Sequence, residues 1–139
     1  MGVYQRIINL MPPHKTYVEG FCGSGAVIRN KRPAEINVAI DLSEDALDLT
    51  ASIAGDRSAI QFVKGDCMHF LESTAFRERA SDALVYLGPP YLMETRKGGA
   101  LYDHEMTNDD HDRLMRIVQI ISGWGAKVMI SGYRSGLYD

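Results

Sequence analysis

The sequence has few cysteines, no excess of positive charge and no long apolar run. Its two cysteines, Cys22 and Cys67, form no CxxC pair and have no zinc-ligand spacing, so we expect neither a disulfide nor a bound metal. Acidic residues outnumber basic ones, 18 to 15, which argues against a broadly basic surface for nucleic acid. The apolar stretches are too short to span a bilayer, and no signal-like segment opens the chain. These absences favour a cytoplasmic protein with no membrane partner.

Internal repeats and low-complexity tracts are absent as well. A length of 139 residues with 45% apolar side chains suits one globular domain, so we treat residues 1–139 as a single domain. Strand and helix patterns alternate along the chain, which predicts an α/β fold with a doubly wound, mostly parallel sheet of about five strands. His104 and His111 stand near Asp109 and Asp110, but solvated loop and cap positions explain them more simply than a metal site does.

Five short apolar segments, each bounded by turn residues, predict buried strands at 16–21, 36–42, 60–64, 83–87 and 127–131. The first helix is expected to end at Pro12-Pro13 and to share one face among Tyr4, Ile7, Ile8 and Met11. A second, capped by Ser43 and ended by Gly55, has an expected buried face of Ala46, Leu49, Thr50 and Ile53. A shorter helix carries Phe70 and Leu71. Thr107 and Asp110 predict a capping box for a last helix, ended by Gly123 and Gly125, with a buried face of Leu114, Ile117, Val118 and Ile121.

A glycine-rich turn, Glu19-Gly20-Phe21-Cys22-Gly23-Ser24-Gly25-Ala26, follows the first expected strand. Glycines at such a place let the backbone approach a ligand closely. A dinucleotide fingerprint would need a small residue where Ile28 stands, so a nicotinamide cofactor is disfavoured. A purely structural turn at Gly23 and Gly25 remains an alternative.

Two carboxylates close the next two strands. Asp41 ends the second strand, where a carboxylate can accept both hydroxyls of a ribose, and Asp66 follows the third, where it can meet an adenine edge. With the glycine-rich turn they outline an adenosine pocket. Two alternatives stay open, because Asp41 can simply flank the helix that Ser43 caps and Asp66 can cap the helix that begins near Cys67.

The segment Gly88-Pro89-Pro90-Tyr91 follows the fourth expected strand, at the end of the sheet where open α/β folds bind ligands. Prolines fix φ and lack N–H donors, so their carbonyls can face outward, while Tyr91 offers a flat face for stacking. The segment can therefore hold an aromatic ring. A structural turn with Tyr91 as a packing residue is the alternative.

In order and spacing, these motifs resemble the class D12 adenine-specific DNA methyltransferases, especially compact phage or prophage forms, over nearly the whole chain. Glu19 to Gly25 is similar to that family's Glu-Pro-Phe-x-Gly-Ser-Gly cofactor loop, and Gly88 to Tyr91 to its Asp-Pro-Pro-Tyr motif. The segment 128–133 resembles the strand that walls the target-base pocket. The resemblance implies a Rossmann-like methyltransferase fold that binds S-adenosylmethionine through Glu19, Phe21, Cys22, Gly23, Ser24, Gly25, Asp41, Leu42, Asp66 and Cys67.

The resemblance also implies a mechanism on double-stranded DNA. The target adenine is flipped out of the duplex and stacked on Tyr91, and its amino group donates to the acid of the motif and to the carbonyl of Pro89. The expected catalytic residues are Gly88, Pro89, Pro90 and Tyr91. Arg96 and Lys97, in the loop that follows, are expected to contact DNA phosphates, with an ordinary exposed charge pair as the alternative.

Departures from the family change the expected activity. Gly88 replaces the acid of the motif. The loss of a charge-assisted hydrogen bond worth roughly 1.5 to 3 kcal/mol predicts that the rate falls at least tenfold to a few hundredfold. Gly20 replaces a common proline, which we expect to loosen the cofactor loop. The chain lacks the family's Gly-Gly-Lys loop and ends where the family continues into further strands, so it resembles a form truncated at both ends. Its fifth strand would then have an unpaired edge, through which it could form a homodimer.

Three functional classes follow from these observations. The first is a DNA adenine-N6 methyltransferase with impaired activity. The second is a pseudoenzyme that binds S-adenosylmethionine or DNA without transferring a methyl group, which Gly88 and the acidic composition favour. The third is a methyltransferase for another planar amino or amide group, on protein glutamine or RNA. A remnant without function is the remaining alternative.

Overall fold

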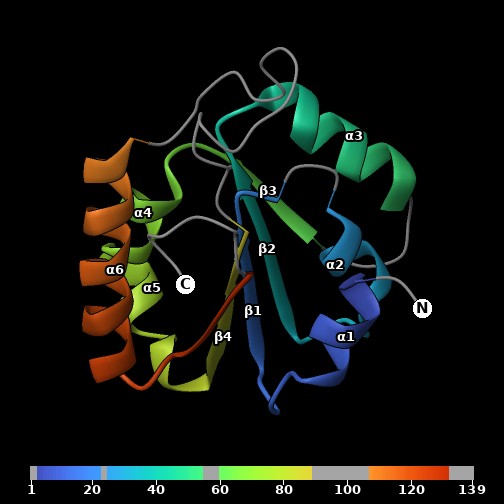
Figure 1. Ribbon diagram of the computed structural model, residues 1–139. Helices are drawn as coiled ribbons and strands as arrows, with labels where there is room; N and C mark the ends of the chain where they lie inside the picture. Colours follow the sequence, from blue (N-terminus) through green and yellow to red (C-terminus); the bar gives the residue numbers. More distant parts are fainter. Residues whose placement is uncertain (1–2, 23–24, 55–59, 89–106, 132–139) are drawn as a thin grey trace.

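The protein folds around a central parallel sheet with helices on both faces, as the computed structural model in Figure 1 shows. The structure describes residues 3–22, 25–54, 60–88 and 107–131. Five parallel strands lie in the order β3-β2-β1-β4-β5. Their bounds are β1 Thr16–Gly20, β2 Ile36–Asp41, β3 Ile60–Lys64, β4 Ala83–Leu87 and β5 Lys127–Ile130. The predicted fold class, an α/β protein with a doubly wound sheet, is confirmed.

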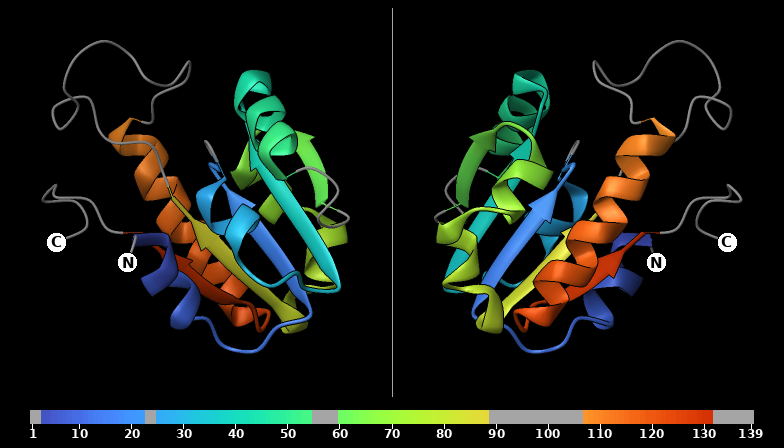
Figure 2. Two further views of the ribbon diagram at one scale, coloured as in Figure 1. Left: turned by 90° about the vertical axis from the view of Figure 1, so that its right-hand side faces the viewer. Right: turned by 90° about the vertical axis from the view of Figure 1, so that its left-hand side faces the viewer.

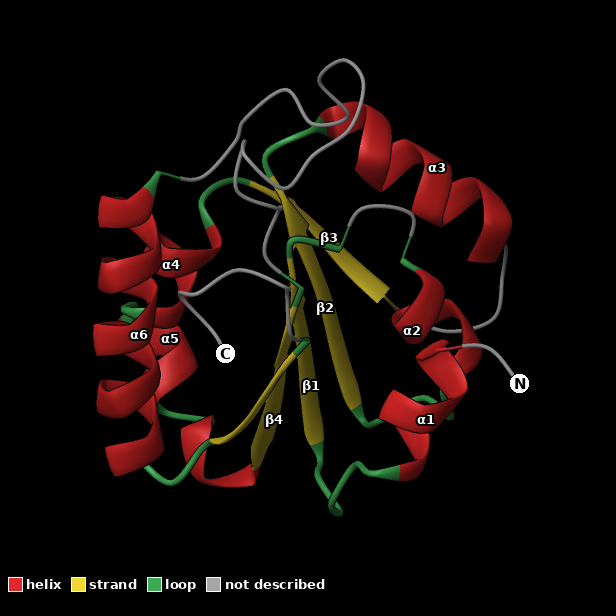
Figure 3. Cartoon of the chain, viewed as in Figure 1, coloured by secondary structure: helices red, strands yellow, loops and turns green. Residues whose placement is uncertain are grey.

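The helices form two layers (Figure 3). One layer holds α1 (Val3–Asn9), α2 (Ala26–Asn30) and α3 (Glu44–Ala54), and the other holds α4 (Cys67–Leu71), α5 (Thr74–Arg77) and α6 (Asn108–Gly123). A single turn, η1 (Ala80–Asp82), leads into β4. The two views in Figure 2 show the twisted sheet between these layers. In the described ranges, no helix combines the length and apolar composition that crossing a membrane requires.

The strands β1 and β4 lie at the centre of the sheet, and all their residues are buried. Because side chains alternate along a strand, each central strand supplies both cores. Val18, Val85 and Leu87 pack in a cluster with Leu114 of α6, whereas Tyr17, Leu84 and Tyr86 pack in a second cluster with residues of α2 and α3. β4 is therefore a continuous apolar run, whereas β1 also buries the polar side chains of Thr16 and Glu19.

Several local predictions hold and several need correction. The capping box of α6 is confirmed, since Thr107 Oγ1 accepts from the Asp110 backbone at 3.1 Å and Asp110 Oδ2 accepts from the Thr107 backbone at 3.0 Å. Three strands were predicted one residue too long, since Phe21, Leu42 and Ser131 lie just past their ends, whereas β3 and β4 have the predicted bounds. Gly55, the expected stop of α3, lies outside the described residues.

The predicted buried face of α3 was partly wrong. Thr50 is buried as expected, but Leu49 and Ile53 are about half exposed, and the other buried residues are Leu47 and Ala54. Both sets have helical spacing, so periodicity did not separate them. The choice comes from packing, because Gly25 at the start of α2 comes so close to Thr50 that an added Cβ would lie 2.5 Å from its Cγ2. This contact turns Thr50 and its neighbours inward.

A second close approach explains Gly20. A Cβ added to this last residue of β1 would lie 2.2 Å from Cys67 Sγ and 2.9 Å from Leu87 Cδ2. Non-bonded atoms do not approach so closely, so a side chain at the end of β1 would force Cys67 and Leu87 to shift. The expectation that Gly20 merely loosens the backbone therefore misses its role: glycine lets the start of α4 and the end of β4 meet over β1.

The substitution Gly20→Ala should destabilise the fold by about 1 to 3 kcal/mol, the usual cost of overpacking a core. Urea unfolding measures this loss. In a Cys67→Ala background the nearest clashing atom is absent, so the same substitution should cost less. Gly123→Ala is the matched control, because an added Cβ there meets nothing within 4 Å. Equal costs for Gly20→Ala in both backgrounds would contradict the role of Cys67.

Candidate functional site

The carboxyl ends of the five strands share one edge of the sheet, at the top of Figure 1. The chain leaves β1 toward β2 on one side and reaches β4 on the other, so the strand order reverses between β1 and β4. In open α/β sheets this switch point is where ligands bind. Here it brings Gly20 and Gly88 together, and the Gly88 backbone donates to the Gly20 carbonyl at 3.4 Å. The glycine-rich turn and the start of the Gly88-Pro89-Pro90-Tyr91 segment therefore meet.

The glycine-rich turn begins with a strained residue. Phe21 has φ of 57°, a left-handed conformation that is uncommon for an aromatic residue. Such strain persists where surrounding structure enforces it, and it is found often at ligand sites. The turn is closed by the Gly25 backbone, which donates to the Cys22 carbonyl at 2.7 Å, and Gly25 itself has φ of 70°. Gly23 and Ser24, also predicted for the cofactor, lie outside the described residues.

Glu19 lies beneath this turn and is 2% exposed. The hydroxyl of Tyr17 donates to Glu19 Oε1 at 2.5 Å, and the carboxylate also accepts from the backbone of Ile28 in α2. Lys31, at the end of α2, places its ammonium 4.3 Å from the centre of the Tyr17 ring and donates to the Arg32 carbonyl. Glu19 therefore ties β1 to the helix that follows the turn, so it supports the turn from below.

Burial shifts the pKa of both ionisable groups named above, Glu19 and Lys31. Removal from water raises the pKa of Glu19 to about 7, against the opposing effect of its hydrogen bonds and of Lys31. Burial lowers the pKa of Lys31 to about 8, although Glu19 opposes the change. The proton on Glu19 is therefore exchangeable near neutral pH.

Asp41 and Leu42 lie at the same edge, directly after β2. Asp41 Oδ1 accepts from the Ser43 backbone at 2.9 Å, and Ser43 in turn caps α3 by accepting from the Ala46 backbone. The carboxylate is thus oriented by the backbone, as the alternative of a helix-flanking residue anticipated. A carboxylate has about four acceptor positions, and the bond from the Ser43 backbone takes one of them. Leu42 is 38% exposed and presents apolar surface beside it.

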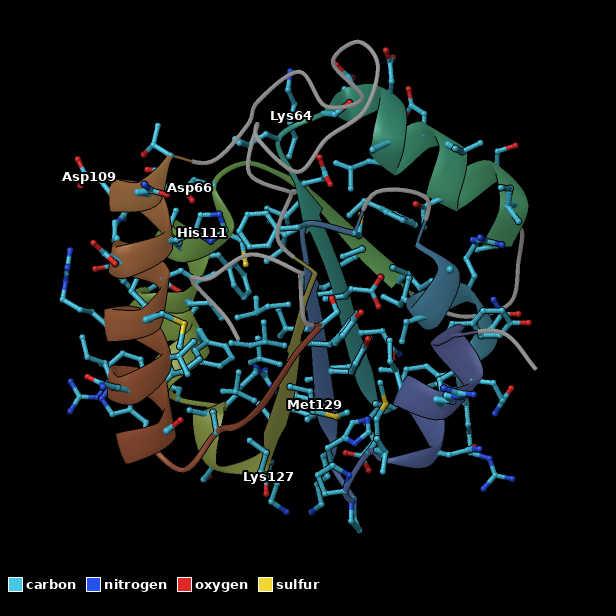
Figure 4. All side chains as sticks on the ribbon, viewed as in Figure 1. Lys64, Asp66, Asp109, His111, Lys127 and Met129 are labelled. Atoms are coloured by element: carbon cyan, nitrogen blue, oxygen red, sulfur yellow. The ribbon has the colours of Figure 1, made fainter. Side chains whose placement is uncertain are left out.

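Asp66 has the helix-capping role that the sequence left open. Its Oδ1 accepts from the Met68 backbone at 2.9 Å and so caps α4. Its Oδ2 lies 3.3 Å from Arg113 of α6, which also pairs with Glu72 at 2.7 Å. These ion pairs join the first turns of α6 to α4. Figure 4 shows Asp66 close to the start of α6.

The expectation for His111 was wrong. This residue was expected at a solvated cap, but it is completely buried in the first turn of α6. Figure 4 shows its ring on the inner side of α6. Since His111 lies three residues before the buried Leu114, it belongs to the same face of the helix. His104 lies outside the described residues.

Both cysteines are buried free thiols, as predicted for small core or pocket-side residues. Burial raises the pKa of Cys22 to about 12, and Asp41 and Glu19 add to the rise. The pKa of Cys67 is raised further, again mainly by burial. Neither thiol can therefore form a reactive thiolate at neutral pH. Cys67 packs against Gly20, and Cys22 bonds to the Thr50 side chain.

Gly88 needs neither a special backbone conformation nor an empty space. A Cβ added there would lie 3.4 Å from Ser131 Oγ, 3.7 Å from the Tyr86 hydroxyl and 3.9 Å from the Phe21 carbonyl, all ordinary contacts. The missing acid is therefore not excluded by the fold. Pro89, Pro90 and Tyr91 of the same motif, and Arg96 and Lys97 beyond it, lie outside the described residues.

The sequence analysis missed four residues that the structure brings to this edge or beneath it. Arg113, Tyr86, Tyr17 and Lys31 carried no signal of their own, because each lies in an ordinary helix or strand and acts through a partner distant in sequence. The position of Tyr17 two residues before Glu19, on one face of a strand, is the single hint that was present.

Neither a group of metal ligands nor either of two cavities among the described residues coincides with the predicted site. Within the described ranges, no three His, Cys, Asp or Glu side chains are grouped so that they could hold a metal ion. One surface cavity of about 320 Å³ lies at the opposite, amino end of the sheet, beside His14, Lys15 and Lys127. Another, of about 190 Å³, lies between the sheet and α5. No residue of the predicted site lines either cavity.

The fold is similar to that of a solved structure, the crystal structure of a SAM-dependent methyltransferase from Agrobacterium tumefaciens. The TM-score is 0.58 with 16% sequence identity, and the match covers 95% of this chain but 43% of that chain. The chain thus spans less than half the length of the protein it matches. At this identity the likeness shows a shared fold, the Rossmann-like fold of that methyltransferase. No family model and no curated protein matches the sequence.

Replacing Glu19 with glutamine should flatten the dependence of stability on pH. Because the folded-state pKa is raised, the folded protein binds this proton more tightly than the unfolded chain does. The contribution to stability is therefore complete below about pH 4.5 and is lost as the pH rises through about 7. Over that range the loss amounts to roughly 3 kcal/mol. Glutamine keeps an acceptor for Tyr17 and has no charge to bury.

Urea unfolding between pH 5 and pH 7.5 measures this effect for the native protein and for Glu19→Gln. Glu78→Gln is the control, since Glu78 is exposed and its removal should leave the slope unchanged. If Glu19→Gln keeps the native slope, Glu19 does not carry the pH dependence.

Proposed function

We propose that this protein is an S-adenosylmethionine-dependent methyltransferase whose target is the exocyclic amino group of adenine in double-stranded DNA, and that Gly88 impairs the transfer. The observation that carries the proposal is the meeting of two sequence motifs at the switch point of a parallel sheet. The glycine-rich turn after β1 and the motif after β4 contact each other through Gly20 and Gly88. The methyltransferase fold of the matched structure supports the reaction class.

The residues at this edge suit the proposed cofactor. Asp41 offers an oriented carboxylate for the ribose hydroxyls, and the exposed side of Leu42 offers an apolar surface for the adenine ring. Asp66 offers an acceptor for the adenine amino group, and its Oδ2 lies 3.3 Å from Arg113. The turn from Phe21 to Gly25 would hold the methionine end, with Glu19 supporting it from below. When bound, S-adenosylmethionine supplies an electrophilic methyl group.

The chain's own part in the reaction is to hold and orient the amino group. Pro89 would accept one N–H through its carbonyl, and Tyr91 would stack on the base. These two contacts would fix the ring plane and direct the nitrogen toward the methyl group, which is catalysis by orientation. A carboxylate at position 88 would also stabilise the positive charge that develops on the nitrogen, and Gly88 does not provide it.

A pseudoenzyme that binds S-adenosylmethionine without transfer is the second candidate. The observation that favours it is specific: Gly88 lacks the acid although an added Cβ would meet only ordinary contacts there. The fold thus has room for a Cβ at position 88, where the chain carries no side chain. A methyltransferase acting on another planar amino or amide group stays an alternative. A site without a carboxylate at position 88 lacks the group that would select for a substrate nitrogen that becomes positively charged.

Replacing Asp41 with asparagine should weaken S-adenosylmethionine binding on the order of tenfold to a hundredfold, the loss expected when hydroxyls lose a charged acceptor. Asparagine can keep the bond from the Ser43 backbone, so the fold should be retained. Isothermal titration calorimetry measures the affinity. Asp45→Asn is the matched control, because Asp45 is an exposed residue in the first turn of α3. If the native protein does not bind S-adenosylmethionine, the proposed function is excluded.

Replacing Gly88 with aspartate should raise methyl transfer to adenine-containing DNA on the order of tenfold to a hundredfold. Transfer of a labelled methyl group to duplex DNA is the measurement. Gly88→Ala is the control, because it adds the Cβ and stiffens the loop without supplying a carboxylate. Equal rates for the aspartate and alanine variants would show that the acid has no part. Preferred transfer to RNA or to a glutamine peptide would favour the alternative substrate class.

A further inference from the structure

Two hydroxyl groups converge on the place where Gly88 lacks a side chain. Ser131 Oγ and the Tyr86 hydroxyl are the two nearest side-chain atoms to a Cβ at position 88, at 3.4 and 3.7 Å. Tyr86 lies in β4, two residues before Gly88, and Ser131 follows directly after β5. They come from adjacent strands, because Leu87 pairs with Ile130 in the parallel register. An acid at position 88 would therefore extend beside both hydroxyls.

The bonds of Ser131 leave it able to accept. Its hydroxyl donates to the Leu87 carbonyl at 3.4 Å, and the hydroxyls of Ser131 and Tyr86 are hydrogen-bonded to each other. A serine hydroxyl can donate once and accept twice. With its proton on the Leu87 carbonyl, the Ser131 oxygen has two acceptor positions, and the Tyr86 hydroxyl can use at most one of them, so at least one remains for a further donor. The Ser131 backbone also donates to the same Leu87 carbonyl at 3.0 Å, which holds the residue against β4.

Tyr86 is more deeply buried than Ser131, so its side chain is held more firmly. Tyr86 is 8% exposed and packs in the cluster with Tyr17 and Leu84. Burial raises the pKa of Tyr86 against the opposing effect of its hydrogen bond with Ser131, and nearby Glu19 adds to the rise, so the hydroxyl stays protonated at neutral pH. Ser131 is only partly buried and lies at the edge of the sheet where the motifs meet. The geometry thus places a held, neutral acceptor beside Gly88.

We propose that Ser131, oriented by Tyr86 and the Leu87 carbonyl, accepts a hydrogen bond from the amino group of the substrate in this protein, in place of the acid absent at position 88. The inference rests on the proposed function. A neutral hydroxyl is a weaker acceptor than a carboxylate and adds no negative charge. The chain would therefore retain slow transfer, above that of a site with no acceptor on this side.

The test is a double-mutant cycle that measures methyl transfer to adenine-containing duplex DNA. The four proteins are the native chain, Ser131→Ala, Gly88→Asp and the double variant. In the native background, Ser131→Ala should lower kcat about threefold to tenfold, the effect of a neutral hydrogen bond, while the affinity for S-adenosylmethionine stays the same. In the Gly88→Asp background the loss should be under about twofold, because the carboxylate now takes the bond.

Two further variants distinguish a hydrogen-bond acceptor role of Ser131 from a purely structural role. Ser131→Thr keeps the hydroxyl and should retain most of the native kcat, whereas Tyr86→Phe removes the orienting partner and should lower it by less than Ser131→Ala does. Ser122→Ala, on an exposed position of α6, is the control that should change nothing. Urea unfolding of each variant reports any loss of stability.

Equal losses from Ser131→Ala in both backgrounds would overturn the inference, because a structural role acts regardless of position 88. No measurable transfer by the native chain, beside clear transfer by Gly88→Asp, would also overturn it and would leave the proposed function standing. If no variant binds S-adenosylmethionine, the proposed function itself fails, and the inference fails with it.

Discussion

The close packing at the end of β1 is the constraint on which the candidate site depends. Gly20 ends the strand with no room for a side chain, so Cys67 at the start of α4 and Leu87 at the end of β4 can both pack over it. These two neighbours belong to the segments that lead to Asp66 and to Gly88. If β1 ended in a larger residue, the side chains of Cys67 and Leu87 would have to shift away from the end of β1. The absence of a side chain at Gly20 thus sets how closely the start of α4 packs on this end of the sheet.

A second constraint acts from within the core. Glu19 is buried beneath the turn, where it joins β1 to α2 through Tyr17 and the Ile28 backbone. A buried carboxyl group is costly to ionise, so it is not retained for stability alone. Its bonds define the path of the chain between strand and helix, and the strained backbone of Phe21 follows directly. The buried carboxyl group and the strained residue together set the shape of the turn between β1 and α2.

The likeness to the Agrobacterium tumefaciens methyltransferase concerns a fold, and a fold can serve many reactions. Function has to be argued from the site. Asp41 and Asp66 lie at the edge where the proposed cofactor would bind, and each is also engaged in local structure. The two roles are compatible, because the capping bond orients a carboxylate without using all of its acceptor positions. Gly88 leaves this edge without an acidic side chain, although an added Cβ there would meet only ordinary contacts.

The sequence alone determined the order of the strands and helices, the capping box of α6 and the glycine-rich turn. These features depend on residues that lie close together in the chain, such as Thr107 with Asp110. Tertiary structure decided the buried face of α3, the burial of His111 and the reason for Gly20. Tertiary structure also decided the pairing of Asp66 with Arg113 and the approach of Tyr86 and Ser131 to Gly88. Each of these depends on atoms from segments that meet only when the sheet has formed, and no local pattern records such a distance.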